Sequence, residues 1–146
     1  MNKKNHNIAI VISEFNYKVT GALLDGAKRA FDNYSKGELK VIKVPGAFEI
    51  PATVKKVASK LSVDAVVTLG AIIKGETKHF DFISSECTRA IQQLTLEFDI
   101  PIIFGVLTTE NSKQALDRAT KKDKGYEVME SAFHMIDTFK EIEQSS

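Results

Sequence analysis

The chain has 146 residues, of which 43% are hydrophobic and 27% charged, as in ordinary globular proteins. This length fits one domain, so residues 1–146 are expected to form a single unit, with residues 1–6 and 143–146 frayed. The formal net charge is +1 and the lysines form no stripe, so charge gives no indication of nucleic acid or an acidic membrane as a partner.

The first seven residues are polar, and no long apolar segment follows them. The sequence therefore predicts neither a signal peptide nor a membrane span, and we expect a cytoplasmic protein. The single cysteine, Cys87, cannot form an internal disulfide, which fits a reducing compartment. Because Cys87 lies on the apolar face of a predicted helix, a small buried residue is favoured over a nucleophile.

Short apolar runs alternate with helical periods along the chain. The runs, rich in β-branched residues, predict strands at residues 7–13, 38–44, 66–73 and 102–107. Apolar residues recurring every three or four positions predict helices at residues 19–34, 50–61, 80–98, 111–119 and 126–142. Pro51 is tolerated in the first turn of the second helix, and Asn111 with Gln114 resembles a capping box.

This alternation predicts an α/β fold with a parallel sheet and helices on both faces. Right-handed crossovers leave few topologies, and the simplest is a three-layer sandwich with a four-stranded, flavodoxin-like sheet. In such a sheet the loops that follow the strands all emerge at one edge. The expected loops are residues 13–17, 45–49, 72–79 and 108–111.

The stretch from residue 66 to residue 81 is the centre of the prediction. A buried strand is followed by a glycine turn and then by a helix, with His79 near the helix start. Ligands of open α/β sheets bind outside the carboxyl ends of strands, and free N–H groups at a helix start favour an anion. His79 would then be an imidazole beside a phosphate or carboxylate; the alternative is a solvated first-turn histidine.

Other loop side chains leave two interpretations open. Phe15 is either a lid over the core or a platform for a flat heterocycle. Glu49 either complements a helix dipole or accepts hydrogen bonds from a polyol. Arg118 either complements the end of a short helix or binds a phosphate with two hydrogen bonds. Two interpretations also stay open for the lysines of the following loop, Lys121, Lys122 and Lys124. They are either solvated or bind an anion.

Several standard sites are missing from the sequence. The first strand leads into no dinucleotide-binding glycine motif, and no Walker motif occurs. No cysteine and histidine spacing fits a metal, and no aspartate ends the third strand, which argues against a phospho-acceptor domain. The residues alone predict an α/β domain that binds an anionic small molecule with an aromatic portion.

Four segments stand out together: Phe-Asn at residues 15–16, Val-Pro-Gly-Ala-Phe-Glu-Ile-Pro at 44–51, Leu-Gly-Ala-Ile-Ile-Lys-Gly-Glu-Thr-Lys-His-Phe at 69–80 and Phe-Gly-Val-Leu-Thr-Thr-Glu-Asn at 104–111. In combination they closely resemble the lumazine synthase family (6,7-dimethyl-8-ribityllumazine synthase). The likeness runs from about residue 8 to residue 139. It implies a transferase-type enzyme of riboflavin biosynthesis that uses no cofactor and no metal. That enzyme condenses 5-amino-6-ribitylaminouracil with 3,4-dihydroxy-2-butanone 4-phosphate, releasing phosphate and water.

The resemblance also implies a role for each matching residue. Phe15, with Asn16 beside it, would stack on the pyrimidinedione. The ribityl hydroxyls would be held by the Ala47 backbone and the Glu49 carboxylate, with Phe48 nearby, and the polar edge of the pyrimidine by the backbone of Ala71, Ile72 and Ile73. The phosphate would be bound by the backbone N–H groups of Gly75, Glu76 and Thr77 and by the Thr77 hydroxyl. His79 would transfer protons, oriented by Glu127, and Arg118 and Lys124 would clamp the phosphate.

The resemblance further implies a homo-oligomer, a pentamer or a larger shell of pentamers, whose sites lie between subunits. Phe104, Arg118 and Lys124 would come from the partner of the chain that supplies Phe15 and His79. The stretch 119–123 departs from the family, being shorter and lacking glycines. This departure bears on shell formation, and it leaves open whether Lys121 or Lys122 takes the place of a further loop lysine.

Two rival functions are compatible with the same fold. One is an archaeal-type pentameric riboflavin synthase, which the Gly-Glu-Thr-Lys-His run at residues 75–79 disfavours. The other is a flavin-binding or shell-forming protein without catalysis, which would not need the phenylalanine, carboxylate, histidine and arginine together.

Overall fold

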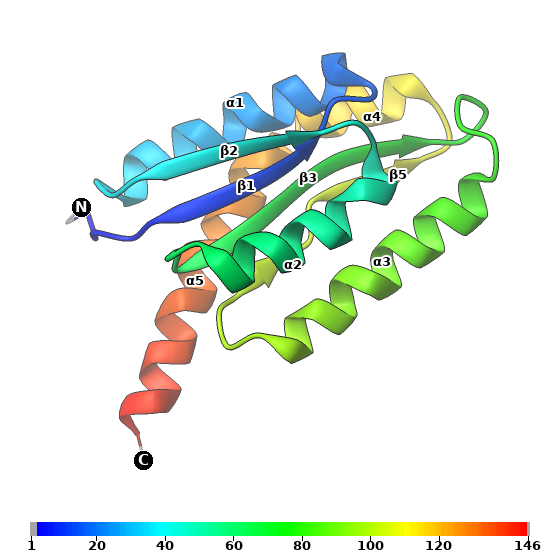
Figure 1. The fold of residues 1–146 in the computed structure, drawn as a ribbon. Coiled ribbons are helices and arrows are strands. Elements are labelled where there is room, and N and C mark those ends of the chain that lie inside the picture. Colours follow the sequence, from blue (N-terminus) through cyan, green and yellow to red (C-terminus); the bar gives the residue numbers. More distant parts are fainter. Residues whose placement is uncertain (1–2, 146) are drawn as a thin grey trace.

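A computed structural model describes residues 3–145 (Figure 1). The strands are β1 (Ile8–Ser13), β2 (Leu39–Val44), β3 (Ala65–Ile73), β4 (Ile102–Ile103) and β5 (Val106–Thr109). The helices are α1 (Tyr17–Tyr34), the short 3₁₀ turn η1 (Ala47–Glu49), α2 (Ile50–Lys60), α3 (Phe80–Glu97), α4 (Ser112–Ala119) and α5 (Lys124–Gln144). The alternation of strands and helices is the one that the sequence predicts.

All the strand pairs of the sheet are parallel, in the order β2-β1-β3-β4, with β5 also pairing with β3. The nine-residue β3 is the central strand and pairs with β1 on one side and with β4 and β5 on the other. The carboxyl ends of β1, β3 and β5 therefore meet at one edge, and the predicted α/β fold is confirmed.

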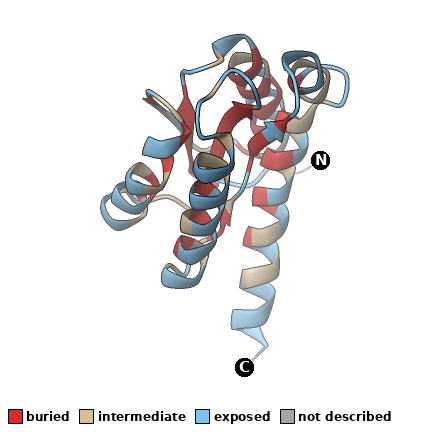
Figure 2. Cartoon of the chain, turned by 90° about the vertical axis from the view of Figure 1, so that its right-hand side faces the viewer, coloured by how far each residue is buried: buried red, intermediate tan, exposed pale blue. Residues whose placement is uncertain are grey.

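The sheet separates two hydrophobic cores. Helices α1, α4 and α5 cover one face, and η1, α2 and α3 cover the other (Figure 1). Side chains of β3 alternate between the two: Val67 and Leu69 face the first core, whereas Val66 and Ile72 face the second. Figure 2 shows the central strands buried and the outer faces of the helices exposed. Burial on both faces explains why β1 and β3 are continuous apolar runs, whereas the edge strand β2 carries the exposed Lys40 and Lys43.

The fourth predicted strand, residues 102–107, is interrupted, so the sheet has five strands where four were expected. At the break, the Thr68 hydroxyl donates to the Ile103 carbonyl (2.8 Å) and accepts from the Gly105 N–H (3.1 Å). A Cβ atom on Gly105 would lie 2.3 Å from the Thr68 carbonyl oxygen, so the close approach requires glycine. The interruption leaves the Phe104 side chain 42% exposed at the sheet edge.

The N-terminal segment also differs from expectation. Residues 1–6 were expected to fray, but Lys4 donates its N–H to Tyr34 (3.1 Å) and accepts from Lys36 (2.9 Å). The His6 side chain is buried beside Phe133. This segment therefore packs against the end of α1 from residue 4 onward; residues 1, 2 and 146 lie outside the described part. Within residues 3–145, no helix combines the length and hydrophobicity needed to cross a membrane.

Candidate active site

Three helices begin at a non-glycine residue in the left-handed backbone conformation. These residues are Asn16 before α1 (φ 63°), His79 before α3 (φ 61°) and Asp123 before α5 (φ 49°). Such a conformation costs on the order of 1–3 kcal/mol for a residue with a side chain, and it is commonest for Asn, Asp and His. All three lie next to predicted site residues, so the strain is concentrated where ligands are expected.

A first pocket of about 320 Å³ opens at the carboxyl ends of β1 and β3 and against η1. It is lined by Phe15, Gly46, Ala47, Phe48, Glu49, Ala71, Ile72, Glu76, Thr77, Lys78 and Ile83. Eight predicted site residues thus line one cavity, although they come from three separate loops. The rings of Phe15 and Phe48 are 51% and 68% exposed. Two exposed aromatic rings at the mouth of an apolar pocket suit a flat, partly polar ligand.

The short turn η1 is fixed by hydrogen bonds on each side. The Glu49 carboxylate accepts from the Gly46 N–H (2.9 Å), and the Glu49 carbonyl accepts from the Thr53 hydroxyl (2.9 Å). On α3, the buried Cys87 thiol donates to the Ala47 carbonyl (3.5 Å). Desolvation by burial raises the pKa of Cys87 to about 11, so the thiol stays neutral. This confirms the interpretation of Cys87 as a buried residue.

His79 is exposed, and it does not line the first pocket, although its neighbour Lys78 does. Its carbonyl accepts the N–H of Ile83 (3.0 Å), and its ring lies 6.0 Å from the Phe82 ring, centroid to centroid. The helix begins at Phe80, three residues beyond Thr77, and a turn at Gly75 (φ 87°) precedes it. The histidine therefore stands at the helix start as predicted, adjacent in the chain to a residue that lines the pocket, and it is open to solvent.

Two predicted site residues face a second pocket instead. This pocket, of about 400 Å³, is lined by Asn16, Lys18, Val19, Ile73, Glu76, Ser112, Lys113 and Leu116. The Asn16 side chain donates to the Ala71 carbonyl (3.3 Å), so it ties the loop after β1 to β3. Glu76 alone lines both pockets. Gly75 lines neither pocket.

A third pocket, of about 380 Å³, lies where β5 meets α4 and α5. Its lining residues are Phe104, Gly105, Val106, Leu107, Thr108, Arg118, Lys122, Lys124 and Glu127. Arg118 donates to the Thr108 carbonyl (3.3 Å), and Lys124 pairs with Glu127 (3.0 Å). Lys122 lines the pocket, whereas Lys121 points to Asp117 (3.9 Å). The sequence leaves open whether Lys121 or Lys122 takes the place of the further loop lysine of the family. The geometry of this pocket favours Lys122 for that place.

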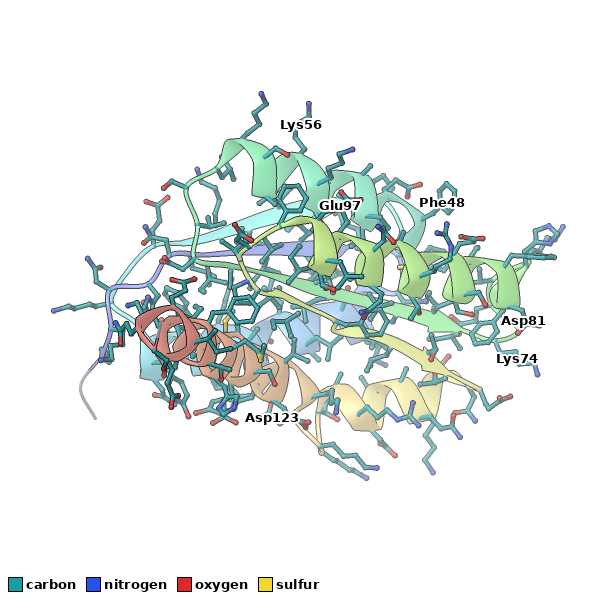
Figure 3. All side chains as sticks on the ribbon, turned by 90° about the horizontal axis from the view of Figure 1, so that it is seen from below. Phe48, Lys56, Lys74, Asp81, Glu97 and Asp123 are labelled. Carbon is teal, nitrogen blue, oxygen red and sulfur yellow. The ribbon has the colours of Figure 1, made fainter. Side chains whose placement is uncertain are left out.

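The first and third pockets share no lining residue. Figure 3 shows Phe48 on the side of the sheet covered by α2 and α3, and Asp123, which precedes Lys124, on the opposite side. Within one chain, Glu127 therefore pairs with Lys124 and is not grouped with His79. The predicted residues form two separate groups on one chain.

The start of α5 is held by contacts from α1. The Arg29 guanidinium donates two hydrogen bonds to the Asp123 carboxylate (2.7 and 2.9 Å) and lies 5.7 Å from the Tyr126 ring centroid. The hydrogen bond to Asp123 raises the pKa of Arg29. Asn33 donates to the Tyr126 hydroxyl (2.8 Å). These contacts fix the short loop before Lys124, and the sequence analysis did not predict them, because their partners are about 94 residues apart.

The residues that line the first pocket without having been predicted are Gly46, Lys78 and Ile83. Each adjoins a predicted residue in the chain or lies one turn along α3, so proximity to the motifs is the only signal that the sequence offers. Among residues 3–145, no three His, Cys, Asp or Glu side chains are grouped closely enough to hold a metal ion.

A pocket lined by aromatic rings and a carboxylate, at the carboxyl edge of a parallel α/β sheet, is the place where proteins of this fold class bind small molecules. Residues 5–140 match the family described as 6,7-dimethyl-8-ribityllumazine synthase, and the chain belongs to this family. It is accordingly a condensing enzyme of transferase type that acts in riboflavin biosynthesis.

One curated relative is the 6,7-dimethyl-8-ribityllumazine synthase of Thermococcus gammatolerans. It is 40% identical over 142 residues, which span 97% of this chain and 92% of the relative. Among solved structures, a de novo designed Rossmann fold protein matches 81% of this chain and 97% of its own, with a TM-score of 0.47 and 17% identity.

Proposed function

We propose that the first and third pockets are the two halves of one active site, in which 5-amino-6-ribitylaminouracil condenses with 3,4-dihydroxy-2-butanone 4-phosphate. The observation that carries this proposal is the gathering of eight predicted residues from three loops around the first pocket. In the proposal the pyrimidinedione stacks on Phe15, and the ribityl chain lies along η1, where Ala47 and Glu49 are already fixed by hydrogen bonds.

The phosphate of the second substrate is proposed to bind at the loop that joins β3 to α3, near Thr77. The start of α3 provides the positive end of a helix dipole, and Lys78 lies beside it. His79, exposed at the same helix start, then acts on protons during imine formation, elimination of phosphate and ring closure. The main contribution of the remaining residues is to hold two small reactants in reactive geometry.

Arg118, Lys124 and Glu127 are proposed to complete the site from a second subunit. Support comes from their grouping in the third pocket with Phe104 and from its separation from the first pocket. Such a heterologous contact closes into a ring, and a homopentamer is the proposed assembly. Measurement of the mass in solution tests it: a monomer would contradict the shared site. The cytoplasmic location predicted from the sequence stays part of this proposal.

Turnover distinguishes the proposed reaction from its rivals. Mixing both precursors should give fluorescent lumazine, and supplying lumazine alone should give no riboflavin. Phe15→Ala should raise KM for the pyrimidine by about 10-fold, since a stacked ring contributes ~0.5–1.5 kcal/mol beyond its burial. Ile142→Ala, which alters another exposed apolar side chain far along α5, is the control and should leave KM unchanged. Riboflavin formed from lumazine alone, or ligand binding without turnover, would contradict the proposal.

A further inference from the structure

The loop between β3 and α3 is tied to the connection between β5 and α4. The Glu76 carboxylate accepts a hydrogen bond from the Ser112 hydroxyl. Lys74 donates its N–H to the Thr109 carbonyl (2.9 Å), and its ammonium lies 3.8 Å from the Glu110 carboxylate. Figure 3 shows Lys74 at the far end of β3, where this loop begins. The loop that carries His79 is therefore positioned from its outer side.

Ser112 is itself part of a rigid helix start. It is the first residue of α4, where the Asn111 side chain accepts the Gln114 N–H (2.9 Å) and the Gln114 side chain accepts the Glu110 N–H (2.9 Å). Capping on both sides keeps the backbone of this turn in one conformation. The hydroxyl of Ser112 consequently presents a fixed donor to Glu76.

Glu76 stands between two electrostatic environments. On the side of the second pocket it shares the cavity lining with two cationic side chains, those of Lys18 and Lys113. On the side of the first pocket it adjoins Thr77, where the phosphate is proposed to bind, and Glu49 lines the same cavity. A carboxylate turned toward that side would repel a bound phosphate, because both groups carry negative charge.

We propose that Ser112 is a positioning residue, whose hydroxyl keeps the Glu76 carboxylate on the side of the second pocket and away from the substrate phosphate. This inference rests on the proposed function, because it requires a phosphorylated substrate at the loop between β3 and α3. Ser112 touches no substrate in this arrangement; it acts through Glu76.

The test is a double-mutant cycle with steady-state kinetics for both substrates. Ser112→Ala should raise KM for the butanone phosphate by about 3- to 10-fold, with KM for the pyrimidine unchanged. The increase should shrink as ionic strength rises, since the repulsion is screened by salt. In a Glu76→Gln background, Ser112→Ala should have no further effect, because the neutral amide does not repel phosphate. Ser112→Thr, which keeps the hydroxyl, should restore the low KM.

Ser59→Ala is the matched control, since Ser59 is an exposed helical serine whose hydroxyl bonds only locally, to the Lys55 carbonyl (2.7 Å). Equal changes in KM for both substrates, or the same penalty in the Glu76→Gln background, would overturn the inference. These outcomes presuppose turnover by the unchanged protein. Absence of turnover in the unchanged protein would instead refute the proposed function, and the inference with it.

Discussion

His79 combines a strained backbone with a ring open to solvent. Its φ of 61° lies in the left-handed region, which disfavours any residue with a Cβ atom, while its ring lies 6.0 Å from the ring of the exposed Phe82, centroid to centroid. The sequence predicts the histidine at a helix start from the glycine turn before it. The strain was not predictable, because hydrophobic period and a glycine turn locate a helix start but do not specify the φ of the residue before it.

Replacing His79 separates its chemical from its conformational role. His79→Ala and His79→Gly should each lower turnover by about 10²- to 10⁴-fold, because the proton-transferring imidazole is lost, while pyrimidine binding persists. The free energy of unfolding of His79→Gly should exceed that of His79→Ala by about 0.5–1 kcal/mol, since glycine adopts positive φ without strain. Urea denaturation measures the difference; an alanine variant as stable as the glycine variant would show that φ at residue 79 is not strained in solution.

Cys87 should resist alkylation in the folded protein. Burial raises its pKa from 9.0 to about 11, so the folded state favours the neutral thiol. The stabilisation linked to this shift is complete below pH 9 and is lost as the pH rises toward 11. Iodoacetamide labelling at pH 8 should be slow in buffer and fast in denaturing urea. Rapid labelling of folded protein at pH 8 would contradict the burial of this thiol.

At the scale of elements, hydrophobic period predicted the α-helices and the positions of the strands, with bounds that shifted by a few residues, whereas η1 lies in a segment that was expected to be a loop. The fourth strand is the informative exception. Its apolar run reads as one strand, but the Thr68 hydroxyl on the neighbouring strand satisfies the Gly105 N–H and the Ile103 carbonyl at the break. A side chain 35 residues away in the sequence determines where this strand stops, so no local pattern could have predicted the interruption.

Thr68→Val should therefore destabilise the fold. Valine matches the shape of threonine but leaves the buried Gly105 N–H and the Ile103 carbonyl without that partner, which costs about 1–3 kcal/mol. Thr68→Ser, which keeps the hydroxyl, should lose much less. The free energy of unfolding from urea titration distinguishes them. Equal stability of the valine and serine variants would mean that the hydroxyl does not hold the break.

At the scale of the whole molecule, the sequence predicted which loops meet at the carboxyl edge of the sheet. The first pocket brings together most of the site residues that were predicted in these loops. The resemblance implied that Phe104, Arg118 and Lys124 act apart from Phe15, but the sequence predicted neither the second pocket nor the position of Glu127. Asn16 lies in the second pocket because its side chain bonds to β3, and Glu127 lies in the third because it pairs with Lys124. The hydrogen-bond partner of each of these side chains depends on the tertiary arrangement. Residue type and spacing in the sequence do not specify that arrangement.

The third pocket should bind the substrate phosphate through the cationic side chains that line it, above all Arg118. Arg118→Ala should raise KM for the butanone phosphate by at least about 10-fold and leave KM for the pyrimidine nearly unchanged, because a charge-assisted hydrogen bond contributes about 1.5–3 kcal/mol. Lys122→Ala should have a smaller effect of the same kind. Lys121→Ala is the control, since Lys121 is outside the pocket and pairs with Asp117. Equal losses for both substrates would indicate a structural arginine.

Complementation between two impaired variants tests most directly whether the two groups of residues meet across a subunit boundary. Co-expressed His79→Ala and Arg118→Ala chains should form mixed rings in which about a quarter of the sites pair an intact His79 with an intact Arg118. At a butanone phosphate concentration well below KM, His79→Ala alone should be nearly inactive and Arg118→Ala alone should keep at most about a tenth of the unmodified turnover, whereas we predict that the mixture recovers about a quarter. If the mixture is no more active than the two variants measured separately, the site is not shared between chains.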